Sequence, residues 1–228
     1  MTVRGYKLEP LQSLTLKILA KSKLKDKFYW TGGTALAFFY LKHRHSHDVD
    51  LFSDLPFTYN EILPLISELK LHTKLKKVDE KRIFDRWEFF IHNKNELKLE
   101  FCHYNFPSLG GKNIWQGISV DSLKDMAANK TMALLDRHEP KDAFDVYFLI
   151  KKSFFSPRDL LKMVKKKFGV KFSLSTLLSQ GLLGASRLHE IRPLLPCSKA
   201  KQNQIIKETI EYFESESVKF LRKKFKLE

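Results

Sequence analysis

Apolar residues recur along this chain with two different periods, and the balance between them changes near residue 115. Before that point, short runs of aromatic and branched residues, typical of strands, alternate with segments of helical spacing. After it, almost every apolar residue falls at helical spacing, and no glycine- or serine-rich linker separates the two halves. The pattern predicts an α+β fold: a mixed α/β unit with a small sheet over residues 1–115, followed by a helical region over residues 116–228.

The first half is predicted to contain helices and strands in alternation. The strands are expected over residues 28–30, 49–52, 72–79, 82–92 and 96–104, with a turn at 93–95 between the last two. The helices are expected after Pro10, over residues 34–41, and from a capping box of Thr58 and Glu61 to about residue 69.

The second half is predicted to be helical, with helix ends marked by capping residues and proline. The helices are expected from a capping box of Ser122 and Asp125 up to Pro140, over residues 141–151, from Ser156 to Gly169, and near the C-terminus, where Ile206, Ile210 and Phe213 share one stripe.

Composition adds a strong positive charge to this picture. The 228 residues include 41 Lys+Arg and 26 Asp+Glu, which gives a net charge of +15. Lysine and arginine favour a polyanionic partner, although solvated basic faces account for such an excess equally simply. Two cysteines exclude a disulfide scaffold, and no apolar run is long enough for a membrane span. We therefore expect a cytoplasmic protein without a membrane partner.

The candidate chemistry is densest between Trp30 and Phe52. Asp48 and Asp50 lie two apart on a predicted strand, so both side chains leave one face with about 6–7 Å between their Cα atoms. Carboxylates so placed can share divalent ions with substrate phosphates. The amides of Gly32 and Gly33, at the start of the next predicted helix, suit a phosphate. Each feature alone is more often a turn or a surface pair.

These residues resemble the nucleotidyltransferase toxins of the AbiEii/AbiGii type, a branch of the DNA polymerase beta-like nucleotidyltransferase superfamily. The resemblance runs through Gly32-Gly33-Thr34-Ala35-Leu36-Ala37, then His43-Arg44-x-Ser46, and closes on Asp48-Val49-Asp50-Leu51-Phe52. A second motif follows in family order, Lys130-x-x-Ala133-x-x-x-Arg137-x-x-x-Lys141-Asp142-x-x-Asp145.

The resemblance implies a minimal polymerase-beta-like core and a set of roles for its residues. Gly32, Gly33 and Thr34 would hold the triphosphate of an NTP, with support from Arg44 and Ser46. Asp48 and Asp50 would bind two Mg²⁺ ions, which Mn²⁺ can replace. His45 and His47 are variable positions in this family; together with His43 they offer zinc ligation as a weaker alternative.

Members of the superfamily usually supply a third carboxylate from a later strand. In the predicted strand 96–104, alternation places Glu100 on the face opposite Leu99 and Phe101. Glu100 is therefore our candidate for a metal ligand or for the base that deprotonates an attacking hydroxyl. An exposed glutamate paired with a lysine is the equally weighted alternative.

Two cations interrupt the apolar side of the helix predicted after Ser122. Lys130 and Arg137 fall within its apolar arc, and Asp142 and Asp145 lie close together on the next helix. An internal salt-bridge network between the two helices would explain this pattern. The resemblance implies instead that Lys130 contacts the phosphates and that Asp145 acts at the same cleft, between the two halves, while Arg137 and Asp142 brace it.

Together these inferences predict an enzyme that moves a nucleoside monophosphate from an NTP to an acceptor hydroxyl, with the 3′ end of tRNA favoured. The resemblance further implies the toxin of a bacterial toxin–antitoxin or abortive-infection system, with a cognate antitoxin. Two alternatives remain open: an enzyme that modifies protein, and a basic nucleic-acid-binding module without turnover. The remaining cations are expected on helix surfaces, at Lys162, Lys165, Lys166, Lys167, Arg222, Lys223, Lys224 and Lys226.

Overall fold

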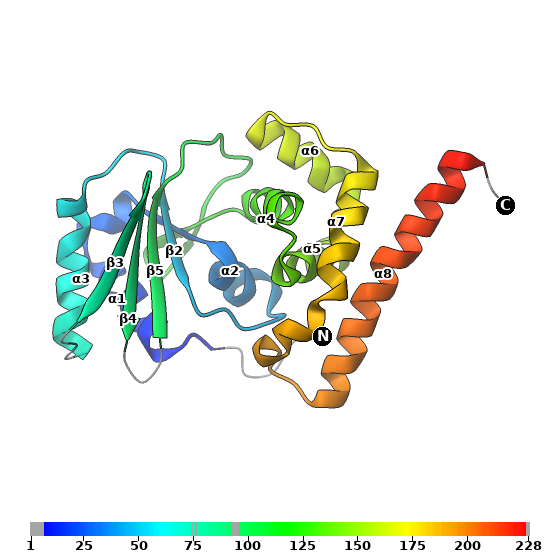
Figure 1. Ribbon diagram of the computed structural model, residues 1–228. Helices are drawn as coiled ribbons and strands as arrows, with labels where there is room; N and C mark the ends of the chain where they lie inside the picture. The colour runs from blue at the N-terminus through cyan, green and yellow to red at the C-terminus, as the bar shows by residue number, and fades with distance from the viewer. Residues whose placement is uncertain (1–6, 74, 76, 93–95, 227–228) are drawn as a thin grey trace. The chain divides into compact units, whose positions relative to one another are not determined.

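The computed structural model describes residues 7–73, 75, 77–92 and 96–226, and its chain divides into two compact units between Leu123 and Lys124. Every strand of the described residues belongs to the first unit, and the second unit is helical (Figure 1). The predicted α+β class, with a mixed sheet followed by a helical region, is confirmed. The boundary after residue 115 stays a prediction; one strand ends at that residue and another follows it in the same sheet.

The sheet of the first unit has seven strands in the order β3-β4-β5-β2-β1-β7-β6. The strands are β1 (Tyr29–Thr31), β2 (Val49–Ser53), β3 (Val78–Ile83), β4 (Arg86–His92), β5 (Glu96–His103), β6 (Asn113–Trp115) and β7 (Ile118–Val120). The pairs β2–β5 and β1–β7 are parallel, whereas the other neighbours are antiparallel. The central strands are thus β5, β2 and β1.

One face of this sheet is apolar and covered by helices. Val49, Leu51, Leu99 and Phe101 lie on it and are fully buried, since alternate residues of a strand point to the same side. The helices α1 (Pro10–Lys21) and α3 (Tyr59–Thr73) contact each other, and the Tyr59 ring of α3 packs on this face against Trp87 and Phe89. The opposite face carries the polar residues of the same strands.

Short helical segments flank β1: one precedes it, and two lie between it and β2. They are η1 (Lys23–Asp26), α2 (Gly32–Ala35) and η2 (Leu36–Leu41), the last with π-helical hydrogen bonding. A helix was expected over residues 34–41, and the structure starts it at Gly32. Lys42 ends η2 in the left-handed region, with φ of 46°.

The strand predicted over residues 72–79 is wrong in its first part. Helix α3 continues to Thr73, whose hydroxyl donates to the carbonyl of Leu69 at 2.5 Å, and the strand begins only at Val78. The helix persists because its last turn keeps this hydrogen bond despite the branched residue. The turn predicted at 93–95 lies outside the described residues.

The second unit contains six helical segments in its described part. They are α4 (Leu123–Arg137), α5 (Pro140–Ser153), α6 (Pro157–Phe168), α7 (Leu174–Ser186), η3 (Leu188–Leu194) and α8 (Lys199–Phe225). Ser156 caps α6 in a complete capping box with Asp159, as predicted. Ile206 and Phe213 of the predicted stripe are buried. No helix in the described ranges combines the length and the apolar character that crossing a bilayer requires.

Close packing around α7 depends on two glycines. A Cβ on Gly181 would lie 2.2 Å from the ring of Phe213 on α8, and a Cβ on Gly184 would lie 2.7 Å from the Cβ of Ala143 on α5. Any side chain at either position would push the helices apart, because protein interiors are packed too densely to absorb it.

Lys167 corrects our assignment of the α6 lysines to the surface. Its side chain is only 3% exposed, and its Nζ lies 2.6 Å from Oδ1 of Asp125, which is 1% exposed. Lys162, by contrast, is 80% exposed, as expected. A buried lysine charge is tolerated only with a partner, so this pair ties the end of α6 to the first turn of α4.

We expect Asp125→Ala to lower the free energy of unfolding by about 3–5 kcal/mol, because it leaves the charge of Lys167 buried without this carboxylate. The double variant Asp125→Leu with Lys167→Met should recover most of the loss, since it removes both charges. Urea denaturation measures the free energy of unfolding of the single and the double variant. Glu211→Gln, which breaks the exposed pair with Lys207, is the control and should cost less than about 1 kcal/mol. An equally small loss in Asp125→Ala would contradict the assigned role of the buried pair.

Candidate active site

A row of polar residues crosses the centre of the sheet on the face opposite Leu51, Leu99 and Phe101. Asp50 of β2 lies opposite Thr31 of β1 on one side and opposite Glu100 of β5 on the other. Glu100 lies in turn opposite Glu88 of β4. Neighbouring strands are about 4.8 Å apart, and residues in register share a face. The structure therefore brings Asp50 and Glu100 together as direct neighbours.

Asp48 lies just before β2, at the end of a loop that other elements hold in place. The hydroxyl of Thr34 on α2 donates to the carbonyl oxygen of Asp48. The side-chain amide of Gln12 on α1 donates to the carbonyl oxygen of Ser46 at 2.7 Å. These bonds fix the loop from two sides. Asp48 and Asp50 are both half-buried, so each carboxylate keeps some access to solvent.

Gly32 touches Asp50 so closely that no other residue fits. A Cβ at this position would lie 1.7 Å from Oδ2 of Asp50, and the backbone φ of 76° is in the region that favours glycine. Gly33 and Thr34 follow in the first turn of α2 and are buried. The glycine pair is therefore more than a turn: it lets the start of α2 lie directly against the Asp50 carboxylate.

The loop before Asp48 contains two buried basic residues. Arg44 is 2% exposed, and its Nη1 donates to the carbonyl oxygen of His45 at 2.9 Å, so it braces its own loop. His43 is also buried. Burial and the neighbouring His47 lower the pKa of His45, which favours its neutral form. Nucleotide contacts by Arg44 and Ser46 stay predictions.

Glu100 belongs to a cluster of two acids and two bases. Nζ of Lys98 lies 3.1 Å from Oε2 of Glu100 and 3.1 Å from Oε1 of Glu88. Arg86 lies 3.5 Å from Glu100 and 3.7 Å from Glu88. Burial disfavours the charged form of Lys98, but Glu100, Glu88 and Asp48 outweigh it and raise the pKa of this lysine. The expectation of a glutamate paired with a lysine is confirmed, although the glutamate is buried rather than exposed.

Two residues of this region escaped the sequence analysis. Glu88 could have been found from the alternation within the predicted strand 82–92, which places it on one face with Arg86. Asp121 gave no such signal. Its carboxylate accepts from the hydroxyl of Thr31 at 2.9 Å and from the amide of Ser122 at 3.0 Å, and its carbonyl accepts from Tyr40 at 2.7 Å. Asp121 thus anchors β1 immediately before the glycine pair.

The residues around Asp50 fit a hard divalent cation that shares its ligands with a substrate. Asp48 and Asp50 supply carboxylate oxygens, whereas Glu100 is engaged by Lys98 and Arg86. Within residues 7–73, 75, 77–92 and 96–226, no group of three or more His, Cys, Asp or Glu side chains is arranged to hold a metal ion. Mg²⁺ commonly takes one or two carboxylates and completes its shell with phosphate and water, which matches this donor set.

The second motif forms the salt-bridge network that we had considered for it. In the helical unit, Nζ of Lys130 lies 2.9 Å from Oδ2 of Asp145 and 3.3 Å from Oδ1 of Asp142. Arg137 donates to both oxygens of Asp142, at 2.7 and 3.2 Å, and this hydrogen bonding raises the pKa of Arg137. Both aspartates are fully buried. They hold the Lys130 ammonium in one position.

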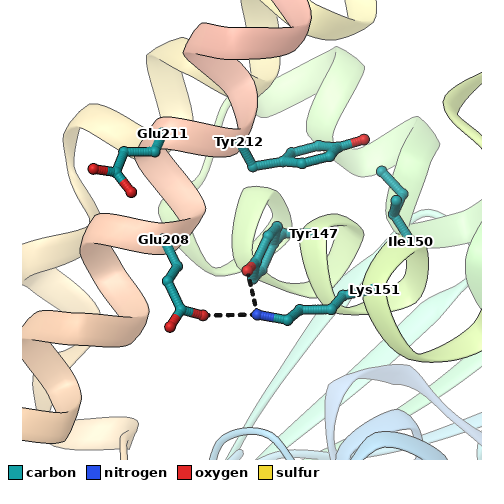
Figure 2. A pocket seen from close by; sticks show the side chains of 6 residues that line it. All are labelled: Tyr147, Ile150, Lys151, Glu208, Glu211 and Tyr212. Carbon is teal, nitrogen blue, oxygen red and sulfur yellow. Dashed lines mark hydrogen bonds and ion pairs between the residues drawn. The ribbon is translucent and has the colours of Figure 1, made fainter.

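A hollow of about 440 Å³ lies in the helical unit and is lined in part by α5, the helix that carries Asp142 and Asp145. Figure 2 shows its lining, which α5 and α8 provide through Tyr147, Ile150, Lys151, Glu208, Glu211 and Tyr212. Lys151 is held there by Glu208 at 2.7 Å and by the Tyr147 hydroxyl at 2.8 Å. None of the predicted site residues lines this hollow.

The raised pKa of Lys98 yields a prediction about stability. A lysine whose folded pKa exceeds its unfolded value, about 10.4, stabilises the protein fully below that pH and stops doing so as the pH rises through the folded pKa. We expect Lys98→Met to lower the free energy of unfolding near neutral pH, and the gap to the unaltered protein to narrow once the pH rises above the unfolded pKa of about 10.4. Denaturant titrations at both pH values measure it. Lys77→Met, at a 79% exposed side chain, is the control and should change the free energy of unfolding only slightly at both pH values. If the free-energy difference between Lys98→Met and the unaltered protein were the same at both pH values, the prediction would be wrong.

Comparison with known proteins agrees with these motifs. Residues 15–221 match the model of a family described as nucleotidyl transferase AbiEii toxin, type IV toxin–antitoxin system. The uncharacterized protein aq_aa25 of Aquifex aeolicus (strain VF5) is 32% identical over 173 residues, which are 74% of this chain and 80% of that protein.

Solved structures share the fold. JHP933 from Helicobacter pylori has a TM-score of 0.59 at 19% identity, with 97% of this chain and 99% of that one covered. MenT4, a nucleotidyltransferase toxin from Mycobacterium tuberculosis H37Rv, has a TM-score of 0.50 at 12% identity, with 89% of this chain and 81% of that one covered. Because the family model spans most of the chain, and both motifs stand within it in order, the chain belongs to the AbiEii family of nucleotidyltransferase toxins from type IV toxin–antitoxin systems, and it is a nucleotidyltransferase.

Proposed function

We propose that this nucleotidyltransferase moves a nucleoside monophosphate from an NTP to an acceptor hydroxyl and releases pyrophosphate. The observation that carries the proposal is the position of Asp50, with the Gly32 backbone against its carboxylate on one side and Glu100 in register on the other. A carboxylate between a glycine turn and a second acid suits a metal-bound triphosphate next to a proton acceptor.

Mg²⁺ is the proposed metal, with Asp48 and Asp50 as its protein ligands. Bound there, the metal would neutralise charge on the phosphates as the transfer proceeds. The backbone at Gly32 and Gly33, with Thr34, is proposed to hold the triphosphate. Divalent metals are general for nucleotidyltransferases of this kind, and the choice of Mg²⁺ depends on the oxygen-only donor set.

Glu100 is proposed as the group that takes the proton from the attacking hydroxyl, or as a further metal ligand. Its contacts with Lys98 and Arg86 hold its carboxylate in one orientation next to Asp50. In phosphoryl transfer the protein contributes mainly by positioning groups and by neutralising charge. A Glu100 carboxylate that is held in one orientation by Lys98 and Arg86 suits such a reaction.

The proposed roles of the second motif depend on the family pattern rather than on geometry. Lys130 is proposed to contact the phosphates, with Arg137 in support. Asp145 and Asp142 hold the ammonium of Lys130, and we propose that Asp145 acts chiefly by doing so.

An RNA acceptor, with the 3′ end of tRNA favoured, is proposed because a net charge of +15 favours polyanions. Membership of a type IV toxin–antitoxin family implies an antitoxin and an NTP substrate.

A protein acceptor and a binding module without turnover are the two alternatives to transfer onto RNA. If the acceptor is a protein, the label on the product will survive RNase treatment. If the protein is only a binding module, it will bind RNA with a steep dependence on salt and will consume no NTP.

The direct test is Asp50→Asn with α-³²P-labelled NTPs, total RNA and lysate protein. We expect the rate of label transfer to fall on the order of a thousandfold, because a metal ligand contributes several kcal/mol to the transition state. Asp79→Asn changes a 45% exposed carboxylate of the same sheet and should leave transfer unchanged. Undiminished transfer by a folded Asp50→Asn protein would refute the proposed site.

Gly32→Ala tests the contact on which the site depends. Its Cβ would lie 1.7 Å from the Asp50 carboxylate, so either Asp50 or the start of α2 must move, and we expect transfer to be lost. Gly111→Ala is a matched control, since a Cβ there meets nothing within 4 Å. Circular dichroism and thermal unfolding check that both variants fold. A Gly32→Ala protein with full activity would show that Asp50 does not need this geometry.

A further inference from the structure

A hollow of about 600 Å³ opens beside Asp48 within the first unit. Its lining includes Phe90 of β4 and Lys98 of β5, together with the carboxylates of Glu9 and Glu96. Lys98 is the same residue that contacts Glu100 at 3.1 Å. The hollow therefore borders the proposed metal ligand Asp48 directly, and Lys98 links it to the proposed proton acceptor Glu100. Its volume is typical of sites for small molecules.

Strand order places this hollow on a defined side of the metal ligands. In the sequence β4-β5-β2-β1, the β2 strand with Asp50 has β1 on one side and β5 on the other. Gly32, where the triphosphate is proposed to bind, directly follows β1. Phe90 and Lys98 are paired in register on β4 and β5. The glycine turn and the hollow thus lie on opposite sides of β2.

Nucleotidyl transfer requires this kind of separation. The oxygen of the acceptor attacks the α-phosphorus while the bond from that phosphorus to the β-phosphate oxygen breaks, and the two oxygens lie roughly in line. With pyrophosphate leaving on the β1 side of Asp50, the attacking hydroxyl must come from the β5 side. That side contains Glu100, which can take the proton of the hydroxyl, and the hollow.

The charges of the lining indicate what kind of group fits. The carboxylates of Glu9 and Glu96 accept hydrogen bonds but repel phosphate, and Lys98 is already shared by Glu88 and Glu100. His47, which also lines the hollow, is bonded to Glu9 at 2.7 Å. A neutral group that donates several hydroxyls therefore suits these walls. The Phe90 ring adds an apolar surface on which a base can stack.

We propose that this pocket receives the terminal nucleoside of an RNA acceptor, with its ribose hydroxyls toward the carboxylates and its base against Phe90. This inference rests on the proposed function and specifies where its acceptor binds. The phosphates of the RNA stay outside the pocket, because the acidic residues of its lining repel them. The nucleoside supplies the hydroxyl, Glu100 takes its proton, and pyrophosphate leaves on the far side.

The test is Phe90→Ala, measured with total tRNA as acceptor and with the NTP that the unaltered protein uses. We expect the KM for tRNA to rise about tenfold or more, through the loss of base stacking, while the KM for the NTP stays unchanged. Phe90→Trp should restore the KM for tRNA because it keeps an aromatic face. Phe84→Ala, at a 91% exposed ring in the same hairpin, is the matched control and should change neither constant.

Each other outcome overturns the proposal in a recognisable way. A rise in the KM for the NTP alone would assign the pocket to the nucleotide donor, and no change in either constant would show that the acceptor does not enter it. Label on protein rather than on RNA would exclude the proposed occupant. If the unaltered protein transfers no label to RNA or to protein, the proposed function itself fails, and the inference fails with it.

Discussion

The site depends on one contact, the approach of the Asp50 carboxylate to the backbone of Gly32. The contact exists only because β1 and β2 pair in the register that sets Thr31 opposite Asp50, so that the glycine turn begins where the carboxylate stands. It requires a residue without a side chain and with a positive φ, and glycine alone meets both conditions at low cost. Any shift of register by one residue would turn Asp50 to the apolar face and remove the site.

Compensation of buried carboxylates by lysine and arginine is the second constraint. Glu88 and Glu100 share Lys98 and Arg86, and the motif of the helical unit repeats this arrangement with two aspartates, one lysine and one arginine. Each cluster pairs two acids with two bases, so neither contributes to the net charge of +15. The positive excess that suggests a polyanion therefore belongs to other residues of the chain.

The sequence predicted local features well, because they depend on neighbours along the chain. The helix ends at Ser156 and Gly169 and the strand before the glycine turn follow from caps and periodicity. It could not predict what depends on pairing between distant residues. The register that joins Asp50 to Glu100 and the burial of Lys167 against Asp125 arise from tertiary contacts that no local pattern records. Glu100 was placed on the correct face by alternation, but its bond to Lys98 could be weighed only as an alternative.

The order of the strands in the first unit places the parts of the proposed site next to one another, which the sequence motifs alone do not reveal. The glycine turn follows β1, Asp50 lies on β2 and Glu100 lies on β5, so three adjacent strands carry, in spatial order, the groups to which we assign the three parts of an in-line transfer. In sequence Glu100 follows Asp50 by fifty residues, with α3 and a hairpin between them. Because the hairpin of β3 and β4 continues the sheet beyond β5, its residues border the side on which we propose that the acceptor binds. Under that proposal, differences in the hairpin change the choice of acceptor and leave the glycine turn after β1 unaltered.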